Sequence, residues 1–297
     1  MKRCCFGGLM KQYDIISSSE TNSSECSNFI ENMVVHYQPQ MAVSHKDPTT
    51  KQGLWKVSGF EALVRMNVDG KTIFPQEFLK NLTTKQLEDL FIFVLSDVCQ
   101  ILKRHGKSFV KPVLVENVHK DCRMSTLEKR RPHRLSFSVN IEPEIISSER
   151  ILSTLADVPK ALRKHIIIEI VEKNVQDYDA FAEAIHYIAE NLGFTIAMDD
   201  FGAGGNVFKI ILTKNIKIVK LDSFFVPGKY QKAIKRREHI LRRNVSAMLR
   251  EMGIKIVAEQ VETPQELKYI LPFVDGIQGF LFGGAKPFSE WAHLFND

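Results

Sequence analysis

Residues 194–205 read FTIAMDDFGAGG: an apolar run leads into two adjacent acids, and glycines follow at once. The apolar part is typical of a buried strand, which places Asp199 and Asp200 at its carboxyl end. Adjacent carboxylates repel each other, and taking them out of water is costly unless a cation compensates for their charge. The stretch therefore predicts a core strand whose end needs a positively charged partner.

Short apolar runs of this kind alternate with longer helical patterns from about residue 30 onward. The strand candidates are 33–38, 54–64, 135–141, 166–171, 194–198, 216–221, 254–258 and 275–281. The helical candidates include 86–104, 150–163, 177–191, 230–252 and 263–271. The alternation favours an α/β fold, and eight strands make a TIM-like (β/α)8 barrel the leading prediction. A doubly wound open sheet is the alternative that spacing alone leaves open.

Polar residues follow most of the predicted strands at their carboxyl ends. In chain order they are Glu61, Arg65, Asn140, Glu169, Glu172, Asp199, Asp200, Lys220, Asp222, Glu259 and Glu262, with Gln278 inside the last strand. One acid in such a place is usually a helix N-cap or a solvated loop residue. In a parallel barrel, however, the strand ends converge on one face, which is where barrel enzymes carry their active sites.

So many carboxylates on one face repel each other strongly unless cations lie between them. Oxygen ligands suit hard divalent cations such as Mg²⁺ or Mn²⁺, and the sequence has no cluster of His or Cys that competes for zinc. A shared carboxylate such as Asp199 can hold two cations about 4 Å apart, which is the arrangement used for phosphoryl displacement. The strand ends therefore indicate a metal centre.

The composition is that of a globular protein with a sizeable core: 297 residues, 44% hydrophobic and 25% charged, with a net charge of +5. Positive charge is concentrated in 104–134 and 229–243, which suits anionic partners, although a solvated face is the simpler explanation of each.

Five cysteines without a CxxC pair indicate neither a disulfide framework nor a zinc ribbon, so a reducing cytoplasm is expected. No apolar run approaches the roughly 18 residues of a membrane span.

Two segments stand apart from the strand–helix alternation. Residues 1–29 are expected to form a flexible leader, because 14–28 is rich in Ser, Asn and acids. Residues 105–134 contain prolines and the first basic cluster, and we expect a partly ordered insertion in a domain that covers 30–297. No sensory domain or second catalytic domain is evident, so a stand-alone catalytic domain is expected.

Nine motifs are similar, in content and in order, to those of the EAL-domain family of cyclic di-GMP phosphodiesterases. They are HYQPQ (36–40), GFEALVRM (59–66), FPQEFL (74–79), SVNI (138–141), EIVE (169–172), DDFGAG (199–204), VKLD (219–222), VAEQVET (257–263) and IQGFLFGGAKP (277–287). The resemblance implies a barrel whose first strand is antiparallel to the rest. It also implies a two-metal hydrolysis of cyclic di-GMP to linear pGpG, with Mg²⁺ or Mn²⁺, which lowers cyclic di-GMP signalling in a bacterium.

The resemblance also implies roles for individual residues. The metal ligands are Glu61, Asn140, Glu169, Asp199, Asp200 and Glu259, with Asp199 shared between the two ions. The catalytic residues are Lys220, which orients or helps to activate the attacking water, together with Glu61 and Glu259. The substrate contacts are Gln38, Asp222 and Arg65, whose guanidinium fork suits a phosphate. Glu262 and Gln278 position water, and Glu172 braces the loop after the fifth strand.

The loop after the fifth strand departs from the family pattern DDFGTGYSSL and reads DDFGAGGNVF (199–208). Gln260 stands where the family has glycine. These departures motivate an alternative function, an EAL-like protein that senses cyclic di-GMP or binds another protein with weak or no hydrolysis. Nucleic acid binding through the basic stretches lacks any supporting motif and is not expected. A homodimer is left open, because the altered loop belongs to the family's dimer interface.

Overall fold

The structure is a computed structural model, and it describes residues 29–46, 53–105, 135–173, 175–202, 207–226 and 235–291. The expected leader (1–29) and insertion (105–134) lie outside these ranges except for one residue each. Residues 203–206 of the altered loop also lie outside them. The predictions for these three segments therefore stay predictions.

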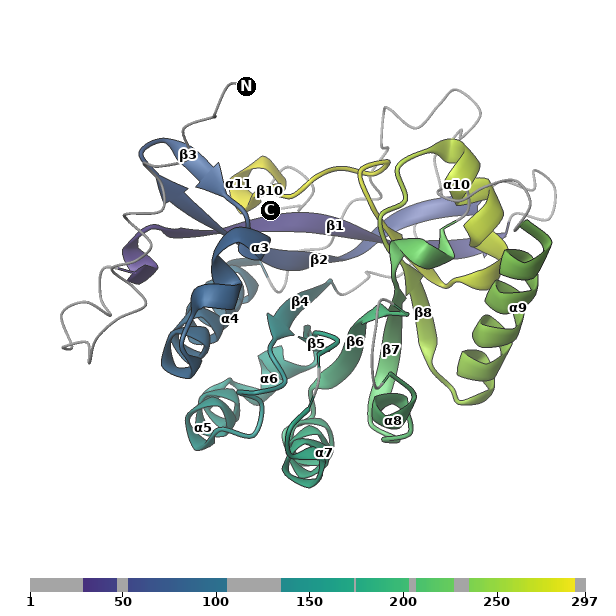
Figure 1. Cartoon of the computed structure of the whole chain (residues 1–297). Coiled ribbons are helices and arrows are strands. Elements are labelled where there is room, and N and C mark those ends of the chain that lie inside the picture. The colour runs from purple at the N-terminus through teal and green to yellow at the C-terminus, as the bar shows by residue number, and fades with distance from the viewer. Residues whose placement is uncertain are drawn as a thin grey trace, which may run out of the picture.

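Eight strands close into a barrel (Figure 1). They are β1 (Met33–Lys46), β2 (Gly53–Val68), β4 (Ser136–Ile141), β5 (Ile166–Ile170), β6 (Thr195–Phe201), β7 (Ile216–Leu221), β8 (Lys255–Ala258) and β9 (Gly276–Gln278). The six pairings from β2 through β9 are parallel, whereas β1 is antiparallel to both of its barrel neighbours, β2 and β9. The predicted barrel with an antiparallel first strand is confirmed.

Two further short strands extend the sheet beyond the barrel. β3 (Lys71–Ile73) pairs with the far end of β2, and β10 (Lys286–Pro287) pairs with β1. Neither was predicted from the sequence, because runs of two or three residues carry no measurable alternation. The strand expected over 275–281 is shorter than predicted and spans three residues.

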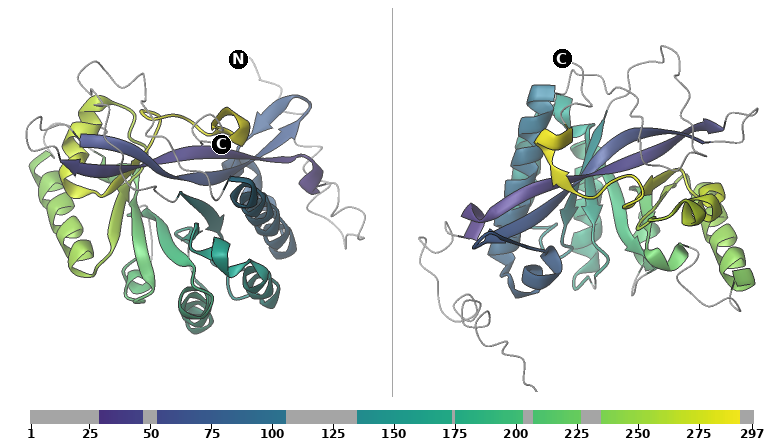
Figure 2. Two further views of the ribbon diagram at one scale, coloured as in Figure 1. Left: turned by 180° about the vertical axis from the view of Figure 1, so that it is seen from behind. Right: turned by 90° about the horizontal axis from the view of Figure 1, so that it is seen from above.

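Helices cover the outer side of the strands (Figures 1 and 2). They are α3 (Pro75–Phe78), α4 (Thr84–His105), α5 (Glu149–Asp157), α6 (Lys160–Arg163), α7 (Tyr178–His186), α8 (Val207–Ile211), α9 (Lys235–Glu251), α10 (Pro264–Ile270) and α11 (Phe288–Trp291). The helix predicted over 150–163 is two helices, because Pro159 has no N–H to continue the first one. The helix predicted over 177–191 finishes in a π turn, Tyr187–Asn191.

The sequence explains the packing of these layers. All five residues of β5 are buried, as expected for a parallel strand with side chains on one face inside the barrel and on the other against helices. α4 buries Leu87, Leu90, Phe91 and Val94, which recur at helical spacing on the side that faces the sheet. The result is a single core that surrounds a barrel interior filled largely by polar side chains at one end.

The first two strands are longer than the sequence predicts, and this changes the place of Glu61. We expected Glu61 near the end of a strand over 54–64, but β2 continues to Val68. β4 pairs with β2 only as far as Ala62, and the rest of β2 continues past the barrel as a ribbon paired with β1 and β3. Glu61 therefore lies in the interior of its strand and still at the rim of the barrel.

Candidate metal centre

One buried ammonium group lies among four carboxylates at the barrel rim. Lys220, on β7, is only 1% exposed. Its Nζ lies 3.0 Å from Oε2 of Glu61, 2.9 Å from Oε2 of Glu169, 3.0 Å from Oδ1 of Asp199 and 2.8 Å from Oε1 of Glu259. These acids come from β2, β5, β6 and the residue after β8. The strand ends therefore converge as the sequence predicts.

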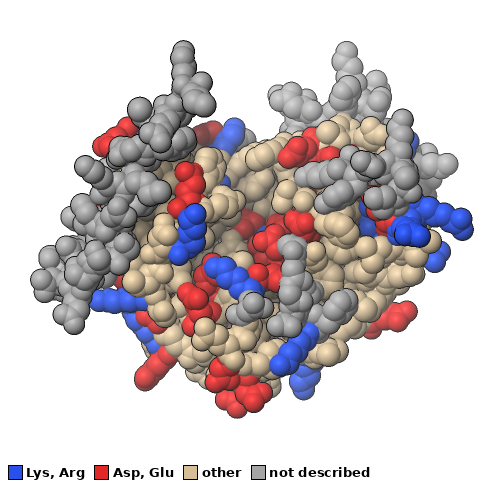
Figure 3. All heavy atoms as spheres, in the orientation of Figure 1, with Lys and Arg blue, Asp and Glu red and all other residues tan. Residues whose placement is uncertain are grey.

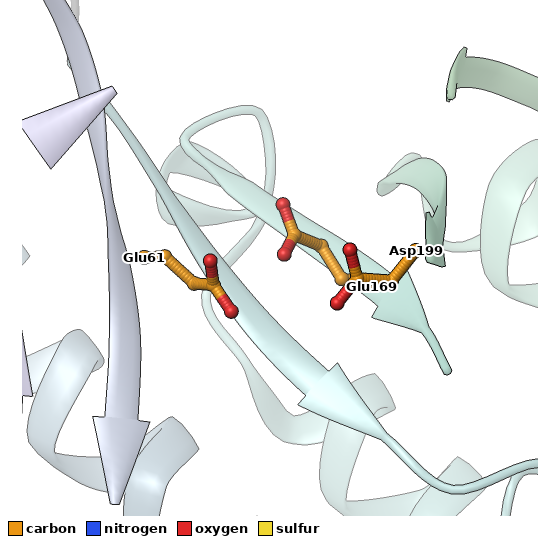
Figure 4. A group of neighbouring side chains, drawn as sticks. All are labelled: Glu61, Glu169 and Asp199. Atoms are coloured by element: carbon orange, nitrogen blue, oxygen red, sulfur yellow. The ribbon is translucent and has the colours of Figure 1, made fainter. Parts of the chain in front are cut away.

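The acids form two overlapping groups that could each hold a cation. The first group is Glu61, Glu169 and Asp199, and the second is Asp199, Asp200 and Glu259. Within each group, one ligand oxygen from every residue lies within 4.8 Å of the others. Figure 4 shows the carboxylates of the first group turned toward a common space from three different strands. Asp199 belongs to both groups, so its carboxylate is placed to be shared between two ions.

Glu61 is fixed by two amides. Asn140 Nδ2 donates to its Oε1 at 2.6 Å, and Gln278 Nε2 donates to its Oε2 at 2.6 Å. Burial alone would raise the pKa of Glu61, but the Lys220 ammonium and these hydrogen bonds outweigh it and lower the pKa. The other atom of the Asn140 amide, Oδ1, is buried and has no hydrogen-bond partner among the described residues. An oxygen left in this way fits a cation ligand.

The remaining acids are less well compensated. Burial raises the pKa of Glu169 to about 7, even though Lys220 opposes the shift. Burial and the neighbouring Asp199 raise the pKa of Asp200 to about 6, and the same two causes raise that of Glu259 well above its ordinary value. Burial would lower the pKa of Lys220, but the surrounding carboxylates outweigh it and raise the pKa. One ammonium group thus leaves excess negative charge, which suits divalent cations.

The backbone turns sharply directly after two of these acids. Asp200 and Gln260 follow Asp199 and Glu259, and both lie in the left-handed region, with φ of 53° and 52°. A residue other than glycine is uncommon there, and the conformation costs of order 1–3 kcal/mol. Gly202 has φ of 101°, and a Cβ at this position would lie 2.4 Å from the Phe225 ring, so only glycine fits. The two strands beside β7 therefore end in constrained turns at the acids.

A cavity of about 490 Å³ opens beside the cluster. Its polar wall includes Glu61, Asn140, Asp199 and Asp200, and its apolar wall comes from α3, α4 and the segment after β4. Figure 3 shows acidic side chains gathered in a hollow at the centre of the face seen in Figure 1. The cavity is large enough for a nucleotide-sized ligand and places it directly against the acids.

Basic side chains line the same cavity. Arg65 lies over the ring of Phe74, 4.9 Å from its centroid, and its Nη1 donates to the carbonyl of Val64 at 2.7 Å. Lys173 forms an ion pair with Glu142 at 2.7 Å, and both residues line the cavity. Since these groups lie beside the acid cluster, the cavity offers cations to an anionic ligand without placing them among the metal-ligand candidates.

Three other residues that the resemblance assigns to the site differ in their contacts. Gln38 is joined to Gln278 by a hydrogen bond of 3.2 Å. Asp222 caps the turn Ser223–Phe225 by accepting from Phe224 N, and its charge is felt at Asp200. The carboxylate oxygens of Glu172 are buried just beyond β5.

Glu262 differs from the rest. Glu262 is exposed and lies two residues before α10, and its backbone N–H donates to the Glu266 carboxylate at 2.8 Å. Among the described residues it belongs to neither acid group. Its assignment to water positioning stays a prediction, and its observed contact is part of the helix cap formed by Thr263 and Glu266.

Gln40 is the residue at the site that sequence reasoning missed. Its Nε2 lies 3.4 Å from Oε1 of Glu169, 3.1 Å from Oε1 of Gln278 and 3.3 Å from Oγ of Ser138. A signal was present, because Gln38 and Gln40 are two residues apart on one strand and therefore face the same side. It was missed because the predicted strand ended at residue 38, whereas β1 continues to Lys46.

Known proteins resemble this chain in sequence over most of its length. A family model described as EAL domain matches residues 27–287. The chain is 27% identical over 237 residues to a probable cyclic di-GMP phosphodiesterase, PdeA, of Escherichia coli K12, which covers 77% of this chain and 29% of the relative. It is 25% identical over 266 residues to the probable cyclic di-GMP phosphodiesterase PdeB of the same organism, covering 87% and 44%. The chain thus spans less than half the length of these relatives.

Solved structures share the fold. The phosphodiesterase PaMucR in complex with c-di-GMP has a TM-score of 0.66 and 22% identity, over 90% of this chain and 97% of that one. The EAL domain protein of Listeria monocytogenes EGD-e has a TM-score of 0.66 and 21% identity, over 93% and 98%. Among the described helices, none combines the length and apolar character that crossing a membrane requires.

Proposed function

The chain belongs to the EAL domain family, and we propose that it hydrolyses cyclic di-GMP to linear pGpG with two divalent cations, Mg²⁺ or Mn²⁺. The observation that carries the proposal is the shared position of Asp199 in two acid groups, each with ligand oxygens within 4.8 Å of one another. The named activities of the curated relatives and the c-di-GMP in the PaMucR structure support the choice of substrate.

Each cation has its own candidate ligands. Glu61, Asn140, Glu169 and Asp199 would hold one, and Asp199, Asp200 and Glu259 would hold the other. The unpaired Oδ1 of Asn140 supports this set, since it points to an acceptor that needs a partner. When bound, the ions offset the charge of a phosphodiester and lower the pKa of a coordinated water.

The side chains of the protein then have separate tasks. Lys220 holds the carboxylates in one geometry through contacts of 2.8–3.0 Å, and its ammonium would orient a water molecule once cations share those carboxylates. Arg65, at the cavity wall, offers a planar fork to a substrate phosphate once its guanidinium leaves the Val64 carbonyl. The apolar wall excludes water from the remainder of the ligand.

The proposal is tested by incubating the purified chain with cyclic di-GMP and Mg²⁺ or Mn²⁺ and separating the products by chromatography. We expect pGpG from the wild type, no product in EDTA, and none from Glu61→Ala. Glu251→Ala, a change of the same kind on α9, is the matched control and should leave turnover intact. Tight nucleotide binding without any pGpG would overturn the proposal and favour a nucleotide sensor.

A further inference from the structure

Three glutamine side chains form a chain of hydrogen bonds across the barrel rim. Gln40 Nε2 donates to Oε1 of Gln278 at 3.1 Å, Gln278 Nε2 donates to Oε1 of Gln38 at 3.2 Å, and Gln38 Nε2 donates to the backbone carbonyl of Gly283 at 3.2 Å. The three glutamines come from β1 and β9, which are neighbours in the barrel. The chain therefore joins the barrel interior to the segment that follows β9.

The donor-to-acceptor direction of this hydrogen-bond chain is fixed at its last member, Gln38. A backbone carbonyl can only accept, so Gln38 must turn its NH₂ group toward Gly283 and its oxygen toward Gln278. The same reasoning sets the amide of Gln278 and then that of Gln40. The amides of Gln278 and Gln40 each have a second N–H, which lies against an acid of the metal centre.

These second N–H groups reach two different carboxylates. Gln278 Nε2 donates to Oε2 of Glu61 at 2.6 Å, and Gln40 Nε2 lies 3.4 Å from Oε1 of Glu169. In both acids, an oxygen is also in contact with Lys220. Since the amide orientations are fixed from Gly283, donors rather than acceptors face both carboxylates.

We propose that Gln40, Gln278 and Gln38 act together as positioning residues, which hold Glu61 and Glu169 in the orientation that binds a divalent cation. The inference rests on the metal centre of the proposed function and deepens it, since it adds Gln40 and gives Gln38 a task that does not involve substrate. Partners of this kind orient metal ligands, and their loss typically weakens metal affinity about 10–100-fold.

A purely structural role explains the arrangement less well. Gln40 and Gln278 are 9% and 4% exposed, and apolar side chains of the same volume would fill this space without needing any hydrogen-bond partner. The backbone at Gly283, where the hydrogen-bond chain ends, is also constrained. Gly283 has φ of 135°, and a Cβ there would lie 3.1 Å from the ring of Trp291. Trp291 in turn donates to the carbonyl of Tyr37 at 2.8 Å.

The test measures Mn²⁺ binding by calorimetry in the absence of any nucleotide. Gln40→Met keeps the side-chain volume but donates no hydrogen bond, and we expect about 10-fold weaker Mn²⁺ binding. Gln38→Met is the second variant. The Gln38 backbone lies opposite Glu61 in the β1–β2 pairing, but among the described residues its side-chain hydrogen bonds connect it to the acids only through Gln278. We expect Gln38→Met to weaken Mn²⁺ binding as well, but by less than Gln40→Met, since the effect passes through the orientation of Gln278.

Asn215→Leu is the matched control, because Asn215 is a buried amide whose hydrogen bond goes to His186, outside the site. It should leave Mn²⁺ affinity at the wild-type value. Wild-type affinity in both Gln40→Met and Gln38→Met would overturn the inference, and so would an equal loss in Asn215→Leu. If Gln40→Met fails to fold, Gln38→Met, at a half-buried position, decides the question.

The two proposals can fail separately. A wild type that binds Mn²⁺ without hydrolysing cyclic di-GMP contradicts the proposed function and leaves the amide chain to be judged by the variants. A wild type that binds no Mn²⁺ overturns the inference together with the two-metal centre.

Discussion

The ammonium nitrogen of Lys220 lies 2.8 Å from Oε1 of Glu259, although the two residues come from different strand ends of the barrel. The same nitrogen contacts three other acids at 2.9–3.0 Å. A lysine ammonium buried to this degree is tolerated only because it is paired with opposite charges. The buried carboxylates around it likewise depend on the ammonium. Lys220 is therefore as much a part of the assembly of the site as of its chemistry.

Lys220→Met should destabilise the protein in EDTA. Breaking a buried charge pair by removing one partner costs about 3–5 kcal/mol, because the other charge is left uncompensated. Urea unfolding in EDTA measures the change. Lys217→Met is the control on the same strand, since Lys217 is exposed and contacts the carbonyl of Lys214. A free energy of unfolding equal to that of the wild type would show that the acids find compensation elsewhere.

The metal-free protein should lose stability as the pH rises from about 4.5 to about 7. The folded-state pKa of Glu169 is raised to about 7 and that of Asp200 to about 6, so in this range the native state binds more protons than the unfolded state. The free energy of unfolding must then fall with increasing pH. Urea titrations in EDTA at several pH values test this, and Glu169→Gln should flatten the decline. A free energy that rises through the same range contradicts the assigned shifts.

Asn140→Ala should weaken Mn²⁺ binding about 10-fold or more. The substitution removes a candidate ligand, Oδ1, together with the donor that fixes Glu61 at 2.6 Å. Calorimetry without nucleotide gives the affinity. Asn67→Ala serves as control, because Asn67 is exposed on the part of β2 that has left the barrel. Unchanged affinity would remove Asn140 from the ligand set.

The sequence was sufficient to predict all eight barrel strands and the convergence of their acids. It succeeded because the parallel strands are buried on both faces and read as continuous apolar runs, such as the IIIEI of β5. It failed for β3 and β10, which are stabilised only by pairing with longer neighbours. It also missed Gln40, because the predicted first strand stopped at residue 38 and the partner Gln278 becomes apparent only when β9 is placed beside β1.

Arg65→Lys should raise KM for cyclic di-GMP with a smaller effect on kcat. Lysine keeps the charge but loses the planar fork that can bind a phosphate through two parallel hydrogen bonds. It also stacks less well on Phe74, which lies 4.9 Å from the Arg65 guanidinium. Steady-state kinetics with saturating Mg²⁺ separates the two constants. A fall in kcat at constant KM would instead indicate that Arg65 acts in the transition state.

Gln260→Gly should stabilise the fold by about 1 kcal/mol or less, because glycine removes the steric cost of φ at 52° while adding conformational freedom to the unfolded chain. Chemical denaturation measures the difference. The same replacement at Gln265, on the exposed side of α10, should destabilise by up to about 1 kcal/mol. If Gln260→Gly costs as much as Gln265→Gly, contacts of the Gln260 side chain outweigh its backbone strain.

The barrel is closed by its first and last strands, β1 and β9, and this makes the order of synthesis matter for the fold. The hydrogen bond between Gln40 and Gln278 connects residues that are 238 positions apart in the sequence. The other residue pairs between β1 and β9 are similarly distant in sequence. A growing chain therefore cannot close its barrel until β9 has been synthesised. Until then β1 has an unpaired edge, and contacts of such long range make folding slow. The three-residue strand β9 therefore closes the barrel. Truncation before Gly276 should leave an open and aggregation-prone sheet.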